Sequence, residues 1–466
     1  MRVLLAVHAF PPRSTAGTEV YTLRLGQALQ ALGHEVRVLS AVHDLADRHG
    51  QVRRRSHAGL EVAEVVSNHE AGTVEGTYAD ATIAAAAGSV VDGFAPDCVH
   101  IQHLLNLASG IVAQARRGGA RVVMTLHDHW LGCFRDGLRM REDLSLCRTI
   151  DHAVCAACVA DSPYLTPAVQ RGLAGAARRA GLGRYLHRVH DMAPRATGRA
   201  LSALRTFAPA PRGLKAALDQ RARNLRAAAL GIDALVAPTR FVGERAVEWG
   251  APADRVTVRG LGAVAGPTRA RGAGPRRRIG YIGAIAPHKG VHVLVEAFRR
   301  VTDPGITLDV HGSLAVAPAY VESLRRAAAG DPRIRFHGGF AEGEQARILA
   351  GLDLVVVPSV WWENSPLVVL EALAEGVPVV ASAIGGLPEI VPDGAGLLVP
   401  PGDVGALSAV IVEAVAGRVL ADALPPLALK TIDEGARELL GVYASLFGSS
   451  KDKPLFGSSK GRRAAS

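Results

Sequence analysis

Residues 361–380, WWENSPLVVLEALAEGVPVV, join a polar loop, an amphipathic helix and the start of a strand. The apolar run LDLVVVP at 352–358 comes just before them and predicts a strand that is buried on both faces. Ser365 is a suitable N-cap and Pro366 a suitable first helical residue. A buried strand, a loop and a helix form the repeating unit of a doubly wound parallel sheet, in which ligands bind at the carboxyl ends of the strands.

Two glutamates flank the start of this helix. Glu363 lies in the loop, and Glu371 lies about a turn and a half into the helix. The amide groups of Leu367 and Val368 would point toward the strand end, where a helix N-terminus favours anions. A carboxylate accepts hydrogen bonds from hydroxyl groups, so the two acids could hold two hydroxyls of one ligand. Alternatively, both are surface acids that the helix dipole favours.

The same rhythm of strands and helices fills both halves of the chain. It breaks between about residues 130 and 228 and resumes with DALVAP at 233–238. We therefore predict an α/β protein with two Rossmann-like doubly wound domains. The predicted N-terminal domain comprises residues 1–228, with an insertion at about 130–228, and the predicted C-terminal domain comprises residues 229–428. A last helix is predicted at 429–447. The tail at 448–466 carries the second copy of a LFGSSK repeat, and we expect it to be disordered.

Length and composition indicate a folded, two-domain protein. The chain has 466 residues, of which 48% are hydrophobic and 21% are charged, which exceeds one ordinary core. No apolar run approaches the roughly 18 residues that span a bilayer. The N-terminal run MRVLLAVHA ends at Pro11, Pro12 and Arg13 without a cleavage site. We interpret it as a first buried strand and expect a cytoplasmic protein.

The formal net charge of +10 is concentrated in one segment. Residues 171–226 contain 13 Lys and Arg against two Asp, a net charge of +11, so the rest of the chain is about −1. The segment is either a solvated helical face or a surface for an anionic membrane, where each basic residue contributes about 1 kcal/mol. Nucleic acid is a third alternative, but we do not expect it because no aromatic platform accompanies the charge.

Further motifs accompany the opening stretch. They are GAIAPHKG at 283–290, GVPVVASAIGGLPEIV at 376–391, AGTEVYTLRLGQALQALGHEVRVLS at 16–40 and TLHD at 125–128. With the Glu363-x7-Glu371 pair, they make the chain resemble the GT-B retaining glycosyltransferases, in particular the large family 4-like group that contains sucrose synthases and bacterial mannosyltransferases. The resemblance covers most of 277–403 and is thinner in the N-terminal half. It implies two Rossmann-like domains that face each other across a cleft.

The resemblance implies roles on the donor side. Glu363 would hold hydroxyls of the donor sugar, Glu371 the ribose of the nucleotide, and Lys289 the diphosphate leaving group. A lysine at a helix start is unfavourable next to the dipole, which supports a phosphate-facing role. Gly283, Leu367 and Val368 complete the candidate donor-binding residues.

One position departs from the family pattern. Family members commonly carry an arginine five positions before the lysine, and this chain has Ala284 there. Either another arginine substitutes, or one cation and helix N-termini hold the leaving group.

The N-terminal half contributes two candidates. Gly17, in STAGTEVY at 14–21, would let the backbone approach a phosphate or an acceptor. The stretch lacks the G-x-G-x-x-G pattern, which argues against a nicotinamide-dependent oxidoreductase. His127 ends a predicted strand, and by resemblance it reaches the donor sugar or the reaction centre. A purely structural histidine is the alternative.

The implied reaction moves a sugar from a nucleotide-diphosphate donor to a hydroxyl of a glycan or lipid-linked acceptor, with retention, in cell-surface polysaccharide or glycolipid synthesis. Glu363, His127 and Lys289 are the candidate catalytic residues. We favour a front-face mechanism without a catalytic cofactor, in which the leaving diphosphate helps to deprotonate the acceptor. A lipid-linked acceptor would fit peripheral membrane contact through 171–226. The alternatives are a nucleotide-sugar epimerase and a non-catalytic zinc-containing scaffold of the same fold.

Four of the five cysteines cluster in the predicted insertion. They are Cys133, Cys147, Cys155 and Cys158. The spacing C-x13-C-x7-C-x2-C ends in the short interval that lets two thiolates bind one metal, and four sulfurs fit tetrahedral zinc. We hypothesise a structural zinc that staples the insertion. An iron–sulfur cluster and four unrelated buried thiols are alternatives, and His129 and His152 are possible replacement ligands.

Overall fold

The structure is a computed structural model. It describes residues 1–68, 72–162, 164–165, 213–263, 276–341, 343–420, 424 and 427–447, with the isolated residues 176, 180, 182 and 185. Most of the basic segment 171–226 lies outside the described residues, as does the predicted tail at 448–466 with its repeat.

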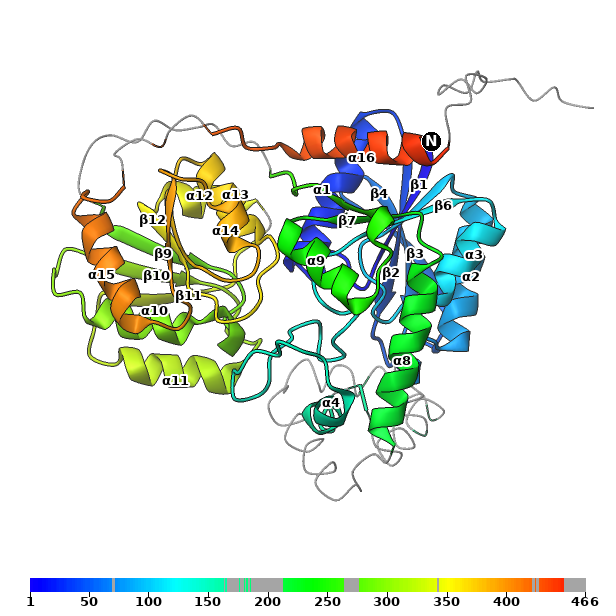
Figure 1. Cartoon of the computed structure of the whole chain (residues 1–466), viewed down its shortest axis with the longest axis horizontal. Coiled ribbons are helices and arrows are strands. Elements are labelled where there is room, and N and C mark those ends of the chain that lie inside the picture. Colours follow the sequence, from blue (N-terminus) through cyan, green and yellow to red (C-terminus); the bar gives the residue numbers. More distant parts are fainter. Residues whose placement is uncertain are drawn as a thin grey trace, which may run out of the picture.

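The first domain is built on a sheet with the strand order β3-β4-β2-β1-β5-β6-β7-β8 among the described residues (Figure 1). All neighbouring pairs are parallel except β3 and β4. The strands are β1 (Arg2–Val7), β2 (Glu35–Val42), β3 (Val52–His57), β4 (Leu60–Val66), β5 (Cys98–Ile101), β6 (Arg121–Thr125), β7 (Ala234–Ala237) and β8 (Val256–Val258).

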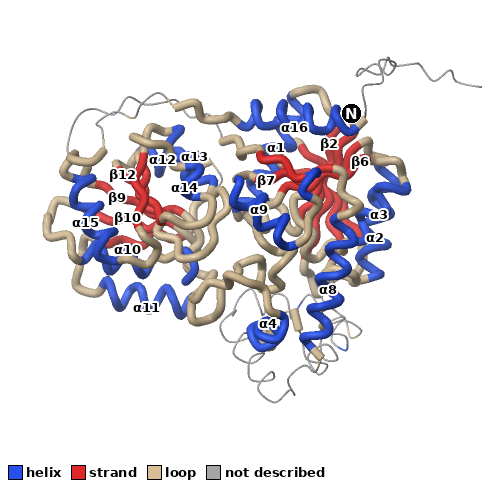
Figure 2. Tube along the Cα trace, in the orientation of Figure 1, coloured by secondary structure: helices blue, strands red, loops and turns tan. Residues whose placement is uncertain are grey.

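Helices cover both faces of this sheet (Figure 2). The described helices of this part of the chain are α1 (Gly17–Ala31), α2 (Ala81–Phe94), α3 (Gly110–Arg117), α4 (His152–Cys158), α8 (Leu214–Ala229) and α9 (Arg240–Trp249), with the short turns η1 (Glu75–Thr77) and η2 (Ala253–Arg255). Of these, α4 packs against α8 and not on the sheet. Side chains alternate along β1: Val3 and Leu5 enter the core beneath α1, whereas Leu4 and Ala6 enter the opposite core. A strand whose two sides are both apolar is what a doubly wound sheet requires.

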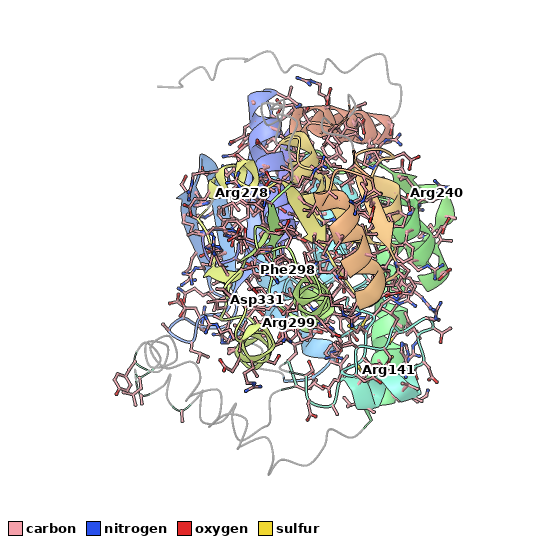
Figure 3. The ribbon with its side chains drawn as sticks, turned by 90° about the vertical axis from the view of Figure 1, so that its left-hand side faces the viewer. Arg141, Arg240, Arg278, Phe298, Arg299 and Asp331 are labelled. Atoms are coloured by element: carbon pink, nitrogen blue, oxygen red, sulfur yellow. The ribbon has the colours of Figure 1, made fainter. Side chains whose placement is uncertain are left out.

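The second domain is built on a parallel sheet with the order β11-β10-β9-β12-β13-β14 among the described residues. Its strands are β9 (Arg278–Ile282), β10 (Thr307–His311), β11 (Ile334–Gly338), β12 (Leu354–Val357), β13 (Val379–Ser382) and β14 (Gly396–Val399). Its helices are α10 (Val291–Arg299), α11 (Pro318–Ala328), α12 (Glu344–Ala350), α13 (Leu367–Ala374), α14 (Leu387–Ile390) and α15 (Val404–Val415), with the turn η3 (Pro287–Lys289). Figure 3 looks onto this domain, where Phe298 is fully buried and Arg299 is exposed. The prediction of an α/β chain with two doubly wound domains is confirmed.

The predicted boundary at residue 229 needs a correction. The strand predicted to open the second domain is β7, and it pairs with β6 of the first sheet, where Val123 is opposite Ala234. β8 then pairs with β7. The first domain therefore extends at least to Val258, and the second sheet begins at Arg278. A buried apolar strand has the same pattern in either sheet, so its sequence does not reveal which sheet it joins.

The last described helix, α16 (Ile432–Leu446), returns to the first domain and lies along α1 (Figure 1). A capping box formed by Thr431 and Glu434 fixes its start. Near its other end, the Tyr443 hydroxyl is hydrogen-bonded to His100 Nδ1 at 2.5 Å, and His100 Nε2 is 2.8 Å from Thr125 Oγ1. Tyr443 and His100 are fully buried, so this chain of bonds anchors the helix to the sheet.

Removing the hydroxyl of Tyr443 should loosen this anchor. In Tyr443→Phe a fully buried ring nitrogen of His100 loses its partner, which is expected to lower the free energy of unfolding by about 1–3 kcal/mol. The midpoint of guanidinium denaturation measures the loss. The control is Ser445→Ala on the exposed side of α16, which should change stability by no more than about 0.5 kcal/mol. A Tyr443→Phe variant as stable as the wild type would contradict the anchoring role.

Candidate active site

The strand order of the second sheet reverses between β9 and β12, which are neighbours although β10 and β11 separate them in the chain. This position is the switch point of the sheet. The loops after these two strands therefore meet at the carboxyl edge, where doubly wound sheets bind ligands. Val360 donates its amide to the carbonyl of His288 at 3.0 Å. Gly290 has φ +70°, and a Cβ there would lie 1.9 Å from the carbonyl oxygen of Pro358. Glycine is thus required for the two loops to touch.

The two loops bring Glu363 and Lys289 together. Lys289 Nζ donates to Glu363 Oε1 at 2.7 Å, and Ser359 Oγ donates to the same oxygen at 2.6 Å. Glu363 is 3% exposed. Its burial raises the carboxyl pKa, but Lys289 and the hydrogen bonds outweigh burial, so the pKa of Glu363 is below its usual value. The ammonium also lies 4.8 Å from the centre of the Trp361 ring.

Polar atoms around this pair have no partner among the described residues. They include the indole nitrogen of Trp362, Oδ1 of Asn364 and Oγ of Ser365, all buried. Buried polar groups are nearly always hydrogen-bonded, so three such atoms in one loop suggest that a polar ligand completes the site. The prediction that Ser365 is the N-cap is wrong, because its hydroxyl makes no capping hydrogen bond among the described residues. Pro366 is the N-cap residue, with ψ 123°, and Leu367 and Val368 are the first helical residues of α13.

The other predicted donor-side residues differ in their surroundings. Gly283 follows β9 with φ +153°, a conformation that L side chains rarely adopt. Ala284 offers its carbonyl to the Tyr281 hydroxyl at 2.7 Å and supplies no charge. Burial is the main cause that lowers the pKa of His288. Two cations, Lys289 and Arg135 of the first domain, lower it further.

Glu371 is already engaged at both oxygens. Oε1 accepts from Arg24 of α1, and Oε2 accepts from Gln345 of α12. The Arg24 contact is an ion pair between the two domains, and Glu371 is 8% exposed. A ribose could reach this carboxylate only by replacing one of these partners. No local pattern marks Arg24, because its partner lies 347 positions away in the chain.

His127 lies at the end of β6 and touches the second domain. Its carbonyl accepts a hydrogen bond from the side-chain amide of Asn364, beside Glu363. Its Nε2 is 2.7 Å from Gln102 Oε1. Burial lowers the pKa of His127 to about 3, so the imidazole is neutral at physiological pH. The structure thus brings His127 to the Glu363 loop. Gly17 begins α1 and is exposed, and a Cβ there would meet no protein atom within 4 Å.

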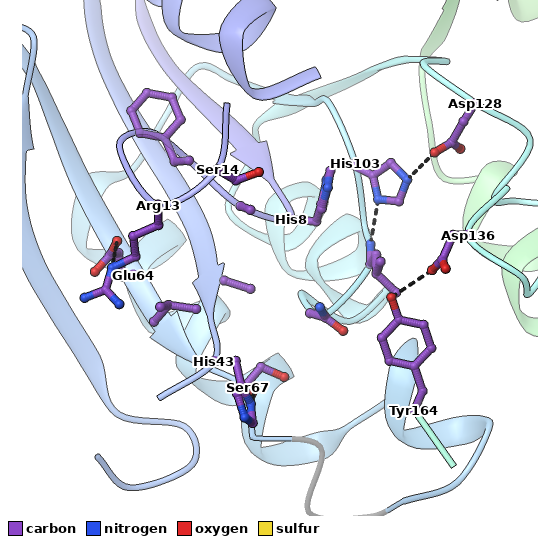
Figure 4. A pocket seen from close by; sticks show the side chains of 16 residues that line it. His8, Arg13, Ser14, His43, Glu64, Ser67, His103, Asp128, Asp136 and Tyr164 are labelled. Atoms are coloured by element: carbon purple, nitrogen blue, oxygen red, sulfur yellow. Dashed lines mark hydrogen bonds and ion pairs between the residues drawn. The ribbon is translucent and has the colours of Figure 1, made fainter. Parts of the chain in front are cut away.

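A cavity of about 640 Å³ lies at the carboxyl edge of the first sheet (Figure 4). His103 Nε2 is 2.9 Å from Asp128 Oδ2, and Tyr164 donates its hydroxyl to Asp136 at 2.7 Å. Burial raises the pKa of Asp128, but His103 outweighs it and brings the value to about 2. Sequence reasoning missed His103, which lies just after β5 at the edge where doubly wound sheets bind ligands.

His8 and Glu19 extend this polar network and were also missed. His8 Nε2 is 3.3 Å from Glu19 Oε1, which also accepts from Ser14 Oγ at 2.7 Å. Burial lowers the pKa of His8, but Glu19 outweighs burial and raises it. The rings of His8 and His103 lie 4.4 Å apart, so the two pairs are continuous, and three of their members, His8, His103 and Asp128, line the cavity.

The four clustered cysteines line one small cavity between α4 and α8. Among the described residues, no group of three or more His, Cys, Asp or Glu side chains is arranged as a metal site. His152 lines the same cavity, with Nδ1 2.7 Å from Asp219. His129 lines a different cavity and does not join the cluster. None of the described helices is both long enough and apolar enough to span a membrane.

The two domains and their switch-point loops define the GT-B class. The solved structure of sucrose-phosphate synthase from Thermosynechococcus elongatus matches with a TM-score of 0.64 and 18% identity, covering 96% of this chain and 100% of that one. HepE from Anabaena in complex with UDP-glucose matches with a TM-score of 0.57 and 15% identity, covering 97% and 100%. At these identities the likeness is one of fold.

The sequence narrows the class to a family. Residues 276–416 match the family model of glycosyl transferases group 1, and residues 16–159 match that of the glycosyl transferase 4-like domain. These two models together match more than half of the chain, which therefore belongs to the family 4-like glycosyltransferases.

Curated relatives share only part of the chain. D-inositol 3-phosphate glycosyltransferase of Mycobacterium sp. (strain KMS) is 34% identical over 158 residues, which are 33% of this chain and 34% of that protein. Glycogen synthase of Mycobacterium tuberculosis (strain H37Rv) is 36% identical over 138 residues, which are 28% and 32%. The matched part thus spans about a third of the length of these relatives.

A methyl group at Gly386 should disturb the Glu363 loop. The Gly386 amide donates to the carbonyl of Glu363 at 2.7 Å, and a Cβ there would lie 2.0 Å from the carbonyl oxygen of Asn364. Gly386→Ala is expected to lower the free energy of unfolding by about 1–3 kcal/mol and to change the fluorescence of the loop tryptophans. Gly441→Ala, at an exposed helical position with open space, is the matched control and should not destabilise. Equal behaviour of the two variants would contradict the close contact.

Buried neutral histidines should make the fold sensitive to acid. Burial lowers the pKa of His100 and His127 to about 3 and that of His129 to about 4, from 6.5. The unfolded chain therefore binds protons first, and stability should fall as pH drops from about 6.5 toward 4, by about 1.4 kcal/mol per pH unit for each histidine. His8, whose raised pKa acts in the opposite sense, offsets part of this.

Denaturation midpoints at several pH values between about 7 and 5 measure this slope. Replacement of His127 by Gln should reduce the slope of stability against pH by about 1.4 kcal/mol per pH unit, the contribution of one proton. Stability that stays constant over this range would show that these histidines do not remain neutral in the folded protein.

Proposed function

We propose that this chain is a retaining glycosyltransferase that moves a sugar from a nucleotide-diphosphate donor to a hydroxyl of a glycan or lipid-linked acceptor, in the synthesis of cell-surface polysaccharide or glycolipid. The observation that carries the proposal is the buried Glu363–Lys289 pair at the switch point of the second sheet. Glu363 lies in the loop that leads into α13, and its neighbour Asn364 donates to the carbonyl of His127 in the first domain.

Donor binding follows from the charges and the unpartnered groups at this point. The diphosphate would lie against Lys289 and the amides of Leu367 and Val368, because a helix N-terminus and an ammonium both favour anions. Sugar hydroxyls would donate to Glu363 and bond to the unpartnered atoms of Asn364 and Ser365. Structures of relatives described as complexes with UDP, UDP-glucose or ADP support a nucleoside diphosphate as the donor group.

Transfer would break the bond between the anomeric carbon and the diphosphate oxygen and form a bond to the acceptor oxygen on the same face of the sugar. The acceptor hydroxyl would pass its proton to the leaving diphosphate. Lys289 and the start of α13 would stabilise the negative charge that develops there, which is the largest catalytic contribution in sites of this kind. His127, neutral at physiological pH, would contact the donor sugar as a dipole and not as an acid.

The acceptor would enter the cavity of the first domain. Its volume of about 640 Å³ lies within the range of about 300–1,000 Å³ that is typical of small-molecule sites. Carboxylates at Glu64, Asp128 and Asp136 line it and suit the hydroxyls of a sugar. Gly17 would leave room for the acceptor or the donor phosphates at the start of α1.

Contact of 171–226 with an anionic membrane belongs to the same proposal. A zinc ion at the cysteines would take no part in the transfer.

Thermal-shift screening with nucleoside diphosphates and nucleotide sugars identifies the donor, and product analysis with candidate acceptors then tests transfer. Glu363→Gln and Lys289→Met should each lower kcat by about 10²–10³-fold, because charge stabilisation in a buried site has this weight. Glu371→Gln should mainly raise the KM for the donor. The matched control is Glu296→Gln, an exposed acid of α10 paired with Arg300, which should leave turnover unchanged.

The other outcomes point to the competing functions. Turnover of the nucleotide sugar without any acceptor would identify an epimerase. No thermal shift with any nucleotide, together with unaltered properties of Glu371→Gln, would identify a binding protein that kept the fold. An inverted product anomer would contradict retention.

A further inference from the structure

The charges at the proposed donor site cancel one another. The Lys289 ammonium pairs with Glu363 at 2.7 Å, and Arg24 pairs with Glu371. A nucleotide diphosphate carries a negative charge on each phosphate, and the leaving group gains further charge as the sugar departs. The first amides of α13 favour an anion, but a helix N-terminus is equivalent to only about half a unit charge. The two ion pairs therefore offer the diphosphate no net positive charge.

A hairpin of the predicted insertion reaches the second domain. Met140 and Leu146 form an antiparallel bridge, and the amide of Arg141 donates to the carbonyl of Ser145 at 2.9 Å. Leu146 packs against the core of the second domain, the same core that Trp362 packs against. In Figure 1 the segment that precedes α4 runs from the first domain toward the second. The hairpin thus belongs to the first domain in sequence and contacts the second domain in space.

Arg135 lies at the base of this hairpin. Its Nη1 donates to the carbonyl of Met140 at 3.1 Å, and the residue is partly buried. Among the described residues, its guanidinium forms no ion pair with a carboxylate. The next residue, Asp136, lines the cavity of the first domain (Figure 4), whereas Arg135 does not line it. The hairpin therefore holds a positive charge that the protein itself does not neutralise and that the cavity does not use.

The charge of Arg135 acts on the residue next to Lys289. His288 precedes Lys289 in the turn η3, and its ring lies 5.1 Å from that of Trp361. Burial lowers the pKa of His288 to about 4, and Lys289 and Arg135 both lower it further. At physiological salt the effect of a charge extends over about 8 Å. One imidazole at the proposed donor site is thus bordered by one cation from each domain.

We propose that Arg135 supplies the second cation for the diphosphate of the donor, an inference that rests on the proposed function. Its guanidinium can turn to a phosphate without breaking an ion pair, and its planar set of donors matches two phosphate oxygens. It would stabilise the negative charge of the leaving phosphate, for which the exposed Ala284 supplies no charge. Because Arg135 belongs to the first domain, the phosphate site would be complete only when both domains contribute to it.

The alternative is that Arg135 only fastens the hairpin. The hairpin has other fastenings, because the amide of Cys147 donates to the carbonyl of Arg139 at 2.8 Å and the Arg139 side chain donates to the carbonyl of Arg148 at 2.8 Å. The hydrogen bond to Met140 uses one N–H group of Arg135, and a guanidinium has several. The remaining donors are available to a ligand.

Calorimetric titration separates the two roles. The nucleoside diphosphate selected by thermal-shift screening should bind Arg135→Gln about 10–100-fold more weakly than the wild type, because charged hydrogen bonds are lost. The affinity for the matching nucleoside, which has no phosphate, should stay the same in a competition assay. In the transfer reaction, kcat should fall at least about tenfold. The matched control is Arg141→Gln, at an exposed position of the same hairpin, which should bind like the wild type.

A second substitution distinguishes a lost charge from a distorted hairpin. Ala284 is exposed, so Ala284→Arg has room and returns a cation to the turn that carries Lys289. In the Arg135→Gln background it should recover most of the lost diphosphate affinity. Unchanged diphosphate affinity in Arg135→Gln, equal weakening of nucleoside and diphosphate, or no recovery with Ala284→Arg would each overturn the inference.

Lys289→Met shows which proposal has failed. If Lys289→Met weakens binding of the diphosphate and Arg135→Gln does not, the proposed function stands and the role of Arg135 is wrong. If the wild type binds no nucleotide at all, both are wrong.

Discussion

The contact between Glu363 and Lys289 is the constraint on which the proposed site depends. A carboxylate and an ammonium, 2.7 Å apart, join the loop after β12 to the turn after β9. Such a pair does little for stability, because both charges lose hydration on burial, whereas loss of either partner costs about 3–5 kcal/mol. Hydrophobic side chains would hold the two loops together at least as well. The pair is better explained by chemistry, because it places an acceptor and a cation at one point in a dry environment.

The same loop also meets the first domain, so the proposed site is formed by both. Asn364 donates to the carbonyl of His127, and Trp362 stacks on Phe241 with ring centres 5.3 Å apart. Glu389, after the glycine pair, accepts the amides of Arg240 and Phe241 at 2.7 and 2.8 Å and so caps α9. These contacts fix where the His127 segment lies relative to Glu363. The loop after β13 packs backbone against backbone on the Glu363 loop. Glycine is needed at 385 and 386 because a Cβ there would meet backbone atoms of Glu363 or Asn364.

The sequence was sufficient for local structure and for residues whose neighbours lie on the same motif. The strand at 352–358, the loop and the helix that follows were predictable because apolar pattern and turn chemistry are local. The placement of Glu363 at the edge followed from the strand order of such folds. Membership of β7 in the first sheet, the Arg24–Glu371 ion pair and the return of Tyr443 to His100 depend on packing between distant segments. No periodicity reports such contacts, and His8 and Glu19 were missed for the same reason.

The ion pair between Arg24 and Glu371 constrains how a donor could enter. Glu371 can receive a ribose only if Arg24 or Gln345 withdraws, and Arg24 belongs to the other domain. A hydrogen bond to a charged group contributes about 1.5–3 kcal/mol, and the Asn364 contact about 1 kcal/mol. A micromolar dissociation constant corresponds to a net binding free energy of about 8 kcal/mol, in which the cost of breaking these contacts is already included. A ribose that replaces Gln345 leaves the contact between the domains in place, whereas a ribose that replaces Arg24 removes an ion pair between them.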